Sequence, residues 1–412
     1  MAGRPLHALL LPQAAGPGRL LDALAAALDG TGPAILPLDP RLPPTRVADL
    51  LQAFSPDVVE TPEGALRPSP PTAVRTPAGS RTDLPAEVAV VIATSGSTGE
   101  PKGAQLSATA LMHSARASLR RLGASPGERW LCPLPTSHIA GLGVLVRSLV
   151  AGTAPVVTDQ LDPARPGLGA PGCAYASLVP TQLRRMLEAG ADLAALRAIL
   201  VGGAAVPASL LAAARAAGAR VVTTYGMSET CGGCVYDGVP LDGVQVRTGE
   251  GGRIRIGGPV VFSGYRNRPD LTAAAVDDDW FVTSDVGRLD PGGRLVVHGR
   301  ADEMINTGGE KVAPAEVAAI LEGCPGVHEA AVFGEPDPQW GERVTAAVVP
   351  IDPVAPPNLA QLRAAVRQQM PSYAAPKALI LVPELPLLPS GKPDLAAIRA
   401  LGREFLSDGR AG

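Results

Sequence analysis

The stretch TSGSTGEPKG, residues 94–103, comes directly after VAVVI at 88–92, a continuous apolar run that predicts a buried strand. Its small residues allow the backbone to curl so that several N–H groups and hydroxyls can face one anion. Lys102 adds a positive charge, as a pyrophosphate leaving group would require. We therefore predict a phosphate-binding loop, and the alternative is a simple Gly/Ser turn that joins a strand to a helix.

The spacing within this loop excludes two common nucleotide-binding devices. A Walker loop places Ser or Thr directly after its lysine, whereas Lys102 is followed by Gly103. The G-x-G-x-x-G pattern that opens a dinucleotide-binding helix does not occur here either. The loop therefore indicates a different class of nucleotide-binding enzyme.

Segments with strand and helix patterns alternate on both sides of the loop, which is typical of a mainly parallel sheet covered by helices. Residues 61–86 contain six prolines and predict a surface loop. Helices are expected over 19–29, 107–122, 142–150, 180–189 and 207–217, and strands over 6–12, 34–38, 88–92, 155–158, 197–201 and 220–223.

The pattern changes after residue 240 to short strands and glycine turns, which predict a β-rich subdomain. From about 302 a compact α+β unit follows, ending in a loop that reaches Lys392. We therefore predict an α/β protein in two parts. Residues 1–301 form a large domain of mainly parallel sheets layered with helices plus the β-rich subdomain, and residues 302–412 form a small α+β domain. In the latter, helices are expected over 314–322 and 359–369, and strands over 328–333, 343–349 and 377–382.

Charge and composition exclude several classes of partner. The 412 residues carry 36 basic and 39 acidic side chains without a basic stripe, which argues against nucleic acid. The five cysteines are an odd number spread through a long chain, which favours a reducing compartment over a disulfide framework. The sequence shows neither a signal-peptide pattern nor a membrane-length apolar run. We expect a cytoplasmic protein without a membrane partner, and homo-oligomer formation is left open.

Five motifs follow one another along the chain: TSGSTGEPKG at 94–103, TYGMSET at 224–230, TSDVG at 283–287, GRADEMINTGGEK at 299–311 and PSGK at 389–392. In this order they together resemble the motifs of the adenylate-forming superfamily, which includes acyl-CoA ligases, firefly luciferases and adenylation domains of peptide synthetases. The resemblance implies that the protein uses ATP and Mg²⁺ to activate a carboxylic acid as an acyl-adenylate.

The resemblance also implies roles for single residues. Glu229 would bind Mg²⁺, Asp285 would accept hydrogen bonds from the ribose hydroxyls, and Arg300 would reach the ribose or a phosphate. In isolation these residues would suit a solvated loop carboxylate, a turn aspartate and a surface arginine. The remaining ATP-binding positions are Thr94, Ser95, Gly96, Ser97, Thr98, Gly99, Lys102, Thr224, Tyr225, Gly226, Met227 and Ser228.

Two further positions concern movement and catalysis. By resemblance, Asp302 is the hinge about which the small domain rotates. Lys392 is the catalytic lysine that enters the site between carboxylate, α-phosphate and ribose, although most lysines in such a loop are simply solvated. A preorganised cation of this kind is typically worth about 3–4 kcal/mol in a transition state.

Further segments resemble the o-succinylbenzoate–CoA ligases of menaquinone biosynthesis, and these imply a dicarboxylate substrate. His138 would act near the reacting carboxylate. Arg147, nine residues later on an otherwise apolar helix, would bind the second carboxylate. The alternatives are a core histidine and an arginine that extends to solvent. Gly202, Gly203, Gly232 and Gly233 would pack against a flat acid, although any close turn would also use them. The segments are PLPTSHIAGL at 133–142, VLVRS at 144–148, SLVPTQ at 177–182, VGGAA at 201–205 and YGMSETCGGCVYD at 225–237.

The acyl acceptor is expected to be coenzyme A, because the glycines of TGGEK at 307–311 leave room for a pantetheine arm. A carrier protein would present the same arm. The rival hypotheses are therefore another acyl- or aryl-CoA ligase, a stand-alone adenylation protein that charges a carrier, and a non-catalytic nucleotide sensor. CGGC at 231–234 lacks a second cysteine pair, so we assign it no metal.

Overall fold

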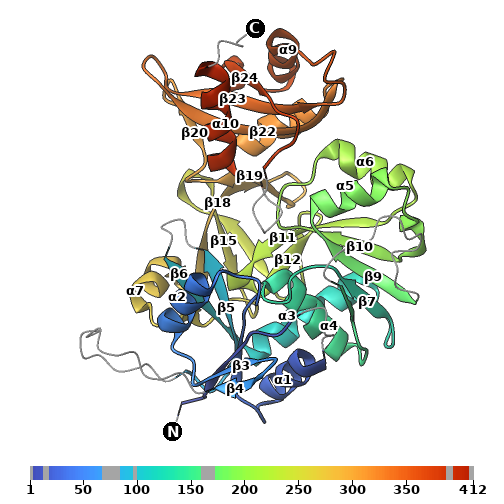
Figure 1. Ribbon diagram of the computed structural model, residues 1–412, viewed down its shortest axis with the longest axis vertical. Helices are drawn as coiled ribbons and strands as arrows, with labels where there is room; N and C mark the ends of the chain where they lie inside the picture. The colour runs from blue at the N-terminus through green and yellow to red at the C-terminus, as the bar shows by residue number, and fades with distance from the viewer. Residues whose placement is uncertain are drawn as a thin grey trace.

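The structure is a computed structural model that describes residues 3–12, 18–66, 84–95, 100–158, 172–386 and 393–407 (Figure 1). Some of the predicted site residues lie outside these ranges, namely Gly96, Ser97, Thr98, Gly99 and Lys392, as does the side chain of Ser95. Most of the loop predicted over 61–86 is also outside the described residues.

A first seven-stranded sheet is built around the apolar run of β5, whose residues Val88 to Val91 are fully buried. Its central strands are parallel, with β2 between β5 and β1. Helices cover both faces of such a sheet, so both faces are apolar. Its strand order is β16 (Gly264–Tyr265), β6 (Pro101–Ser107), β5 (Val88–Ser95), β2 (Ala34–Pro37), β1 (Leu6–Leu9), β3 (Val58–Thr61) and β4 (Gly64–Leu66).

A second seven-stranded sheet has five neighbouring parallel strands followed by two antiparallel ones at one edge. Its order is β13 (Val239–Pro240), β12 (Gly232–Tyr236), β11 (Val221–Met227), β10 (Ala198–Val201), β9 (Cys173–Leu178), β7 (Arg129–Cys132) and β8 (Val156–Val157).

Helices α3 (Ala108–Leu122) and α4 (Ile139–Val150) contribute to the apolar cores of both sheets and therefore lie between them (Figure 1). Helix α1 (Gly18–Asp29) packs in the same core as α3 and α4. The outer face of the second sheet is covered by α5 (Pro180–Glu188) and α6 (Ala208–Ala216), and that of the first sheet by α2 (Pro44–Phe54). This layering places the ends of the two sheets side by side, where the predicted motifs meet.

A five-stranded sheet follows the second seven-stranded sheet, and a further sheet with helices follows it (Figure 1). The five-stranded sheet consists of β14 (Gln245–Thr248), β15 (Arg253–Gly257), β17 (Val276–Asp277), β18 (Trp280–Leu289) and β19 (Leu295–Arg300), with α7 (Pro269–Ala275) beside it. The last unit contains β20 (Ile305–Thr307), β21 (Glu310–Val312), α8 (Pro314–Glu322), β22 (Val327–Asp337), β23 (Gly341–Pro350), α9 (Leu359–Gln369), β24 (Ala378–Leu381) and α10 (Leu395–Ser407). Single 3-10 turns are η2 (Leu193–Ala195), η3 (Ser228–Thr230), η4 (Glu250–Gly252) and η5 (Ser372–Ala374).

The predicted fold class is confirmed: the protein is α/β, with a β-rich part and a smaller α+β unit at its end. The domain boundary at 301/302 stays a prediction. Several local predictions were incomplete, and α2, β3, β7, β9 and β12 have no counterpart among the predicted elements. β6 intervenes between the loop and α3, β4 lies within the expected 61–86 loop, and α10 follows the last motif. Within the described ranges, no helix is long and apolar enough to cross a membrane.

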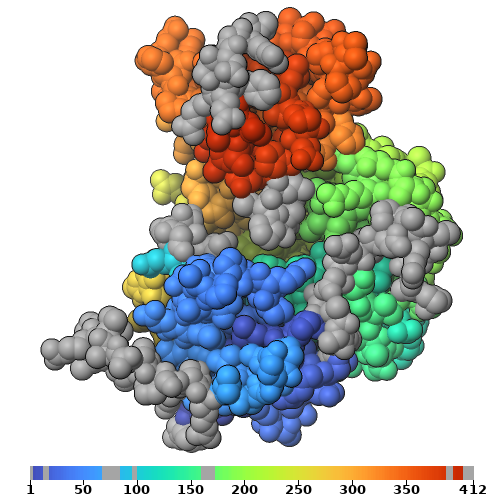
Figure 2. Space-filling view, in the orientation of Figure 1, coloured from blue at the N-terminus to red at the C-terminus, as the bar shows by residue number. Residues whose placement is uncertain are grey.

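The last unit lies against α5 through charged contacts (Figure 2). The guanidinium of Arg184 donates to the carbonyl of His328 at 3.0 Å and lies 3.4 Å from Glu329 and 3.8 Å from Glu322. Burial raises the pKa of Glu322. A second contact joins His298 on β19 to Glu316 on α8. These contacts between this unit and the rest of the protein are therefore polar and charged.

Candidate active site

The predicted phosphate loop connects the two strands of a hairpin. Thr94 on β5 pairs with Lys102 on β6, and its hydroxyl donates to the carbonyl of Lys102 at 3.3 Å. The alternative of a strand-to-helix turn is therefore wrong. The hairpin returns Lys102 to the strand end, and its ammonium group lies 5.6 Å from the centre of the Tyr265 ring.

Tyr265 links this loop to the second motif. Its hydroxyl donates to Glu229 Oε1 at 2.7 Å, so that Lys102 and Glu229 contact the same tyrosine. Burial, and then the adjacent Glu229 carboxylate, raise the pKa of Tyr265, which keeps it a hydrogen-bond donor. Tyr265 could not be predicted from the sequence, because it lies on a two-residue edge strand 36 positions after Glu229.

The second, third and fourth motifs also meet. The hydroxyl of Tyr225 donates to Asp285 Oδ2 at 2.7 Å, and burial followed by this carboxylate raises the pKa of Tyr225. Asp285 on β18 is opposite Arg300 on β19, and Arg300 donates to both oxygens of Asp302 at 2.9 and 2.7 Å. The predicted ribose-binding residue and the predicted hinge residue are therefore connected through one arginine.

Close contact with Thr224 explains why two of the four predicted pocket residues are glycines. A Cβ atom at Gly202 would lie 2.2 Å from Thr224 Oγ1, and one at Gly233 would lie 3.0 Å from Thr224 Cβ. Gly203 and Gly232 have φ angles of +85° and +91°, which favour glycine in any case. Close packing within the protein therefore explains these glycines, and contact with an acid stays a prediction. Met227 and Ser228 continue this segment from the end of β11 into η3.

We predict that Gly202→Ala destabilises the protein and disturbs Thr224. The added methyl group overlaps Thr224 Oγ1, so the two strand ends must separate. Overpacking of this kind costs about 1–3 kcal/mol in the free energy of unfolding, measurable by urea denaturation. Gly18→Ala is the control, because a Cβ there meets open space. Equal stability of the two variants would contradict the packing role of Gly202.

His138 is the N-cap residue of α4, which starts at Ile139, three residues earlier than predicted, and its side chain is exposed. It is therefore not a core histidine. Surrounding protein lowers the pKa of its imidazole, while the nearby Asp39 carboxylate acts in the opposite direction. The ring is accordingly neutral near pH 7.

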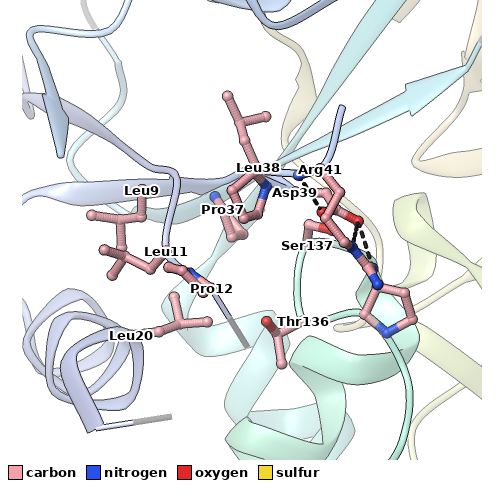
Figure 3. A pocket seen from close by; sticks show the side chains of 12 residues that line it. Leu9, Leu11, Pro12, Leu20, Pro37, Leu38, Asp39, Arg41, Thr136 and Ser137 are labelled. Atoms are coloured by element: carbon pink, nitrogen blue, oxygen red, sulfur yellow. Dashed lines mark hydrogen bonds and ion pairs between the residues drawn. The ribbon is translucent and has the colours of Figure 1, made fainter. Parts of the chain in front are cut away.

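A small cavity of about 80 Å³ adjoins this turn and is lined by the ends of β1 and β2 and by residues 135–137 (Figure 3). Asp39 and Arg41 lie at its rim, joined by hydrogen bonds of 2.9 and 2.8 Å. The cavity is too small for an aromatic dicarboxylate, and the arginine at its rim is already paired with Asp39. We do not assign the acid to it.

Arg147 points into the protein from α4, so the alternative of a side chain that extends to solvent is wrong. Its Nη2 donates to Ser177 Oγ on β9 at 3.0 Å, and its guanidinium lies 4.4 Å from the centre of the Trp130 ring. Burial lowers its pKa. Its Nε–H is buried without a hydrogen-bond partner. A buried cation in this state has an unfulfilled requirement for an anion.

The segment predicted to guide coenzyme A lies beside an exposed aromatic ring. Trp340, 40% exposed, packs on Gly308, where a Cβ would lie 3.0 Å from the indole. The ammonium group of Lys377 lies 3.5 Å from the centre of the Trp340 ring and 3.4 Å from Thr307 Oγ1. The sequence analysis missed both residues, because neither belongs to a motif.

The cysteines of CGGC are both buried free thiols, and burial raises the pKa of Cys231 and Cys234. In the part of the chain that the structure describes, no group of three His, Cys, Asp or Glu side chains could hold a metal ion. The role of Glu229 as a Mg²⁺ ligand stays a prediction.

Comparison with known proteins agrees with this geometry. The family model for AMP-binding enzymes matches residues 23–266, and the model for their C-terminal domain matches 316–392. A probable 2-succinylbenzoate–CoA ligase of Mycobacterium tuberculosis is 45% identical, over 95% of this chain and 97% of the relative.

Two solved structures are also similar. The o-succinylbenzoate CoA synthetase of Bacillus subtilis, in complex with its acyl-adenylate intermediate, gives a TM-score of 0.77 at 26% identity, covering 95% of this chain and 87% of the other. The amide bond synthetase McbA of Marinactinospora thermotolerans gives a TM-score of 0.81 at 28% identity, covering 97% and 90%. The converging motifs and these matches show that the chain belongs to the family of AMP-binding enzymes.

Proposed function

We propose that this protein activates o-succinylbenzoate with ATP and transfers the acyl group to coenzyme A. The observation that carries the identity of the acid is Arg147, a buried guanidinium without an acidic partner among the described residues, on the helix that begins beside His138. A dicarboxylate supplies the missing anion while its other carboxylate reacts. The 45% identity to a 2-succinylbenzoate–CoA ligase supports this proposal.

In the first half-reaction, a carboxylate oxygen of the acid attacks the α-phosphorus of ATP and the bond to pyrophosphate breaks. Lys102 supplies positive charge beside the phosphate loop, and Asp285 accepts hydrogen bonds from the ribose hydroxyls. By the family resemblance, residues 94–99 would contact the phosphates, although 96–99 lie outside the described residues. Thr224 to Ser228 would contact the adenylate.

The carboxylate of Glu229 fits Mg²⁺, because carboxylate oxygens are among the ligands that this ion prefers. When bound, the ion would neutralise phosphate charge and polarise the α-phosphate. Tyr265 holds one oxygen of Glu229 at 2.7 Å and thereby orients the carboxylate. This contact supports Glu229 as a ligand held in one position beside Lys102.

The acid would lie beside the first turns of α4, because the guanidinium of Arg147 extends back to Gly143, where a Cβ would lie 3.4 Å from Nη1. The neutral imidazole of His138 would meet the succinyl carboxylate without adding a second cation beside the reacting atoms. Arg147 would hold the ring carboxylate in a bidentate arrangement. Gly203 and Gly232, where a Cβ would meet no atom closer than 3.5 Å, would leave room for the flat ring, whereas Thr224 occupies the space at Gly202 and Gly233.

In the second half-reaction, the thiol of coenzyme A attacks the acyl carbonyl carbon and AMP leaves. We propose that the last unit rotates about Asp302 between the two half-reactions, so that Lys392 serves the first and the 307–311 segment serves the second. The ion pair between Arg300 and Asp302 supports a hinge coupled to the ribose site. The exposed Trp340 offers a stacking surface beside the path of the pantetheine arm. We propose that the reaction takes place in the cytoplasm, where ATP and coenzyme A are both present.

A panel of acids tests the proposal. The purified protein receives ATP, Mg²⁺ and coenzyme A with o-succinylbenzoate, benzoates, cinnamates or fatty acids, and AMP release and thioester mass are measured. We expect the highest kcat/KM with o-succinylbenzoate. Activity with benzoates or fatty acids and none with o-succinylbenzoate would favour the rival acyl- or aryl-CoA ligase. Adenylation that requires a carrier protein would favour the stand-alone adenylation protein, and ATP binding without turnover would favour a sensor.

A further inference from the structure

We propose that Trp130 is a positioning residue that sets the plane of Arg147 and thereby determines selectivity for an acid with a second carboxylate. This inference rests on the proposed function, since it concerns the same acid. Trp130 lies on β7, is fully buried, and stacks beneath the guanidinium at 4.4 Å. No sequence motif includes it.

The stack continues along the second sheet, because Trp130 on β7 and Tyr175 on β9 are register partners. The rings of Trp130 and Tyr175 are 4.8 Å apart, at an interplanar angle of 26°. The hydroxyl of Tyr175 donates to Glu128 Oε2 at 3.0 Å, and Glu128 pairs with Arg197 at the surface. The guanidinium of Arg197 lies 6.0 Å from the centre of the Tyr175 ring. Trp130 is therefore held on its far side and cannot turn away from Arg147 without breaking this arrangement.

Two buried donors at the inner end of the stack are unsatisfied. Trp130 Nε1–H and Arg147 Nε–H have no hydrogen-bond partner, although both are buried. Among the described residues no acidic side chain pairs with Arg147, and the groups that favour its charge are Tyr236 and Cys132, whose own pKa values burial raises. Both neighbours are therefore neutral near pH 7. Buried donors are rarely left unpaired in native proteins, so this end of the stack is built to meet an acceptor.

Stacking on an indole has a specific consequence for a guanidinium. It fixes the plane of the five N–H donors, while Ser177 holds Nη2 and fixes the rotation within that plane. A carboxylate that approaches in this plane is bound by two parallel hydrogen bonds. Without the indole the cation remains but its plane is free to tilt, so discrimination between a diacid and a monoacid should fall.

The test compares o-succinylbenzoate with 4-oxo-4-phenylbutanoate, which has the same reacting chain but lacks the ring carboxylate. Acid-dependent ATP–pyrophosphate exchange is measured for wild type, Trp130→Met and Trp130→Phe. We expect Trp130→Met to lose about 10–30-fold in kcat/KM with the diacid and little with the monoacid. Trp130→Phe keeps an aromatic face and should retain most of the preference. Equal losses with both acids would overturn the positioning role and leave the proposed function intact, whereas a wild type that uses neither acid would overturn both.

A second measurement leaves Trp130 in place. The chain has three tryptophans, so the double variant Trp280→Phe, Trp340→Phe reports Trp130 fluorescence alone. We expect o-succinylbenzoate to shift this emission and the monoacid to leave it unchanged, because only the diacid places a carboxylate on Arg147. The same response to both acids, or none to the diacid, would contradict the assignment.

Discussion

The Lys392→Ala variant is expected to lose adenylate formation by about 10²–10³-fold in kcat, since it removes a cation that acts on developing charge in the transition state. Acid-dependent ATP–pyrophosphate exchange measures this step without coenzyme A. The KM for ATP should change little, because Lys102 and the phosphate loop remain. Lys392 lies outside the described residues, so the prediction rests on the PSGK motif and on the family match that extends to this residue.

The second half-reaction distinguishes a catalytic role from a general loss of structure. When o-succinylbenzoyl-adenylate is supplied, Lys392→Ala should still form the thioester at close to the wild-type rate, because the last unit presents a different surface in that step. Arg367→Ala is the matched control, an exposed cation on α9 of the same unit, and both half-reactions should be unchanged. If Lys392→Ala lost both half-reactions equally, Lys392 would not act in the first half-reaction alone, and the prediction would be refuted.

Arg147→Ala is expected to reduce kcat/KM for o-succinylbenzoate by about 10²–10³-fold, because it removes one partner of a buried charge pair in the substrate complex. Activity with 4-oxo-4-phenylbutanoate should be unchanged or higher, since this acid leaves the guanidinium without an anion. Arg147→Lys keeps the charge without the planar fork and should recover only part of the loss. Initial rates of AMP formation over a range of acid concentrations measure all three variants.

Arg185→Ala is the control for this series, because Arg185 is exposed on α5 and makes no predicted contact with the acid. Full activity of Arg147→Ala with o-succinylbenzoate would remove Arg147 from the pocket. A loss of the same size with the monoacid would show that the side chain serves the structure of α4 and the second sheet, and the acid would then have to be bound elsewhere.

The elements that could be predicted from the sequence are those whose residues show one clear pattern, such as a continuous apolar run. VAVVI at 88–92 is a continuous apolar run, and the structure buries all five residues. β6 was missed because PKGAQLS is short and partly polar, and its pairing with β5 depends on the hairpin and on the β16 edge. α10 was missed because it follows the last motif, where no resemblance directed attention.

Site residues that belong to a sequence motif could be predicted. Site residues whose position depends only on packing in the folded protein could not. Tyr225 and Asp285 were named separately, but their 2.7 Å contact follows from how β11 and β18 approach each other in space. Tyr265, Trp130 and Tyr175 carry no motif, and each acquires its place through a neighbour distant in the sequence. Gly202 was predicted for the acid, whereas the structure shows that Thr224 already requires it.

The most direct test of the central claim is the stoichiometry of one quenched reaction that contains ATP, Mg²⁺, o-succinylbenzoate and coenzyme A. AMP, ADP and thioester are quantified together by liquid chromatography and mass spectrometry at several times. The account predicts that AMP and o-succinylbenzoyl-CoA accumulate in equal amounts, with neither formed when the acid is omitted. Formation of ADP in place of AMP, or AMP release without any thioester, would contradict it.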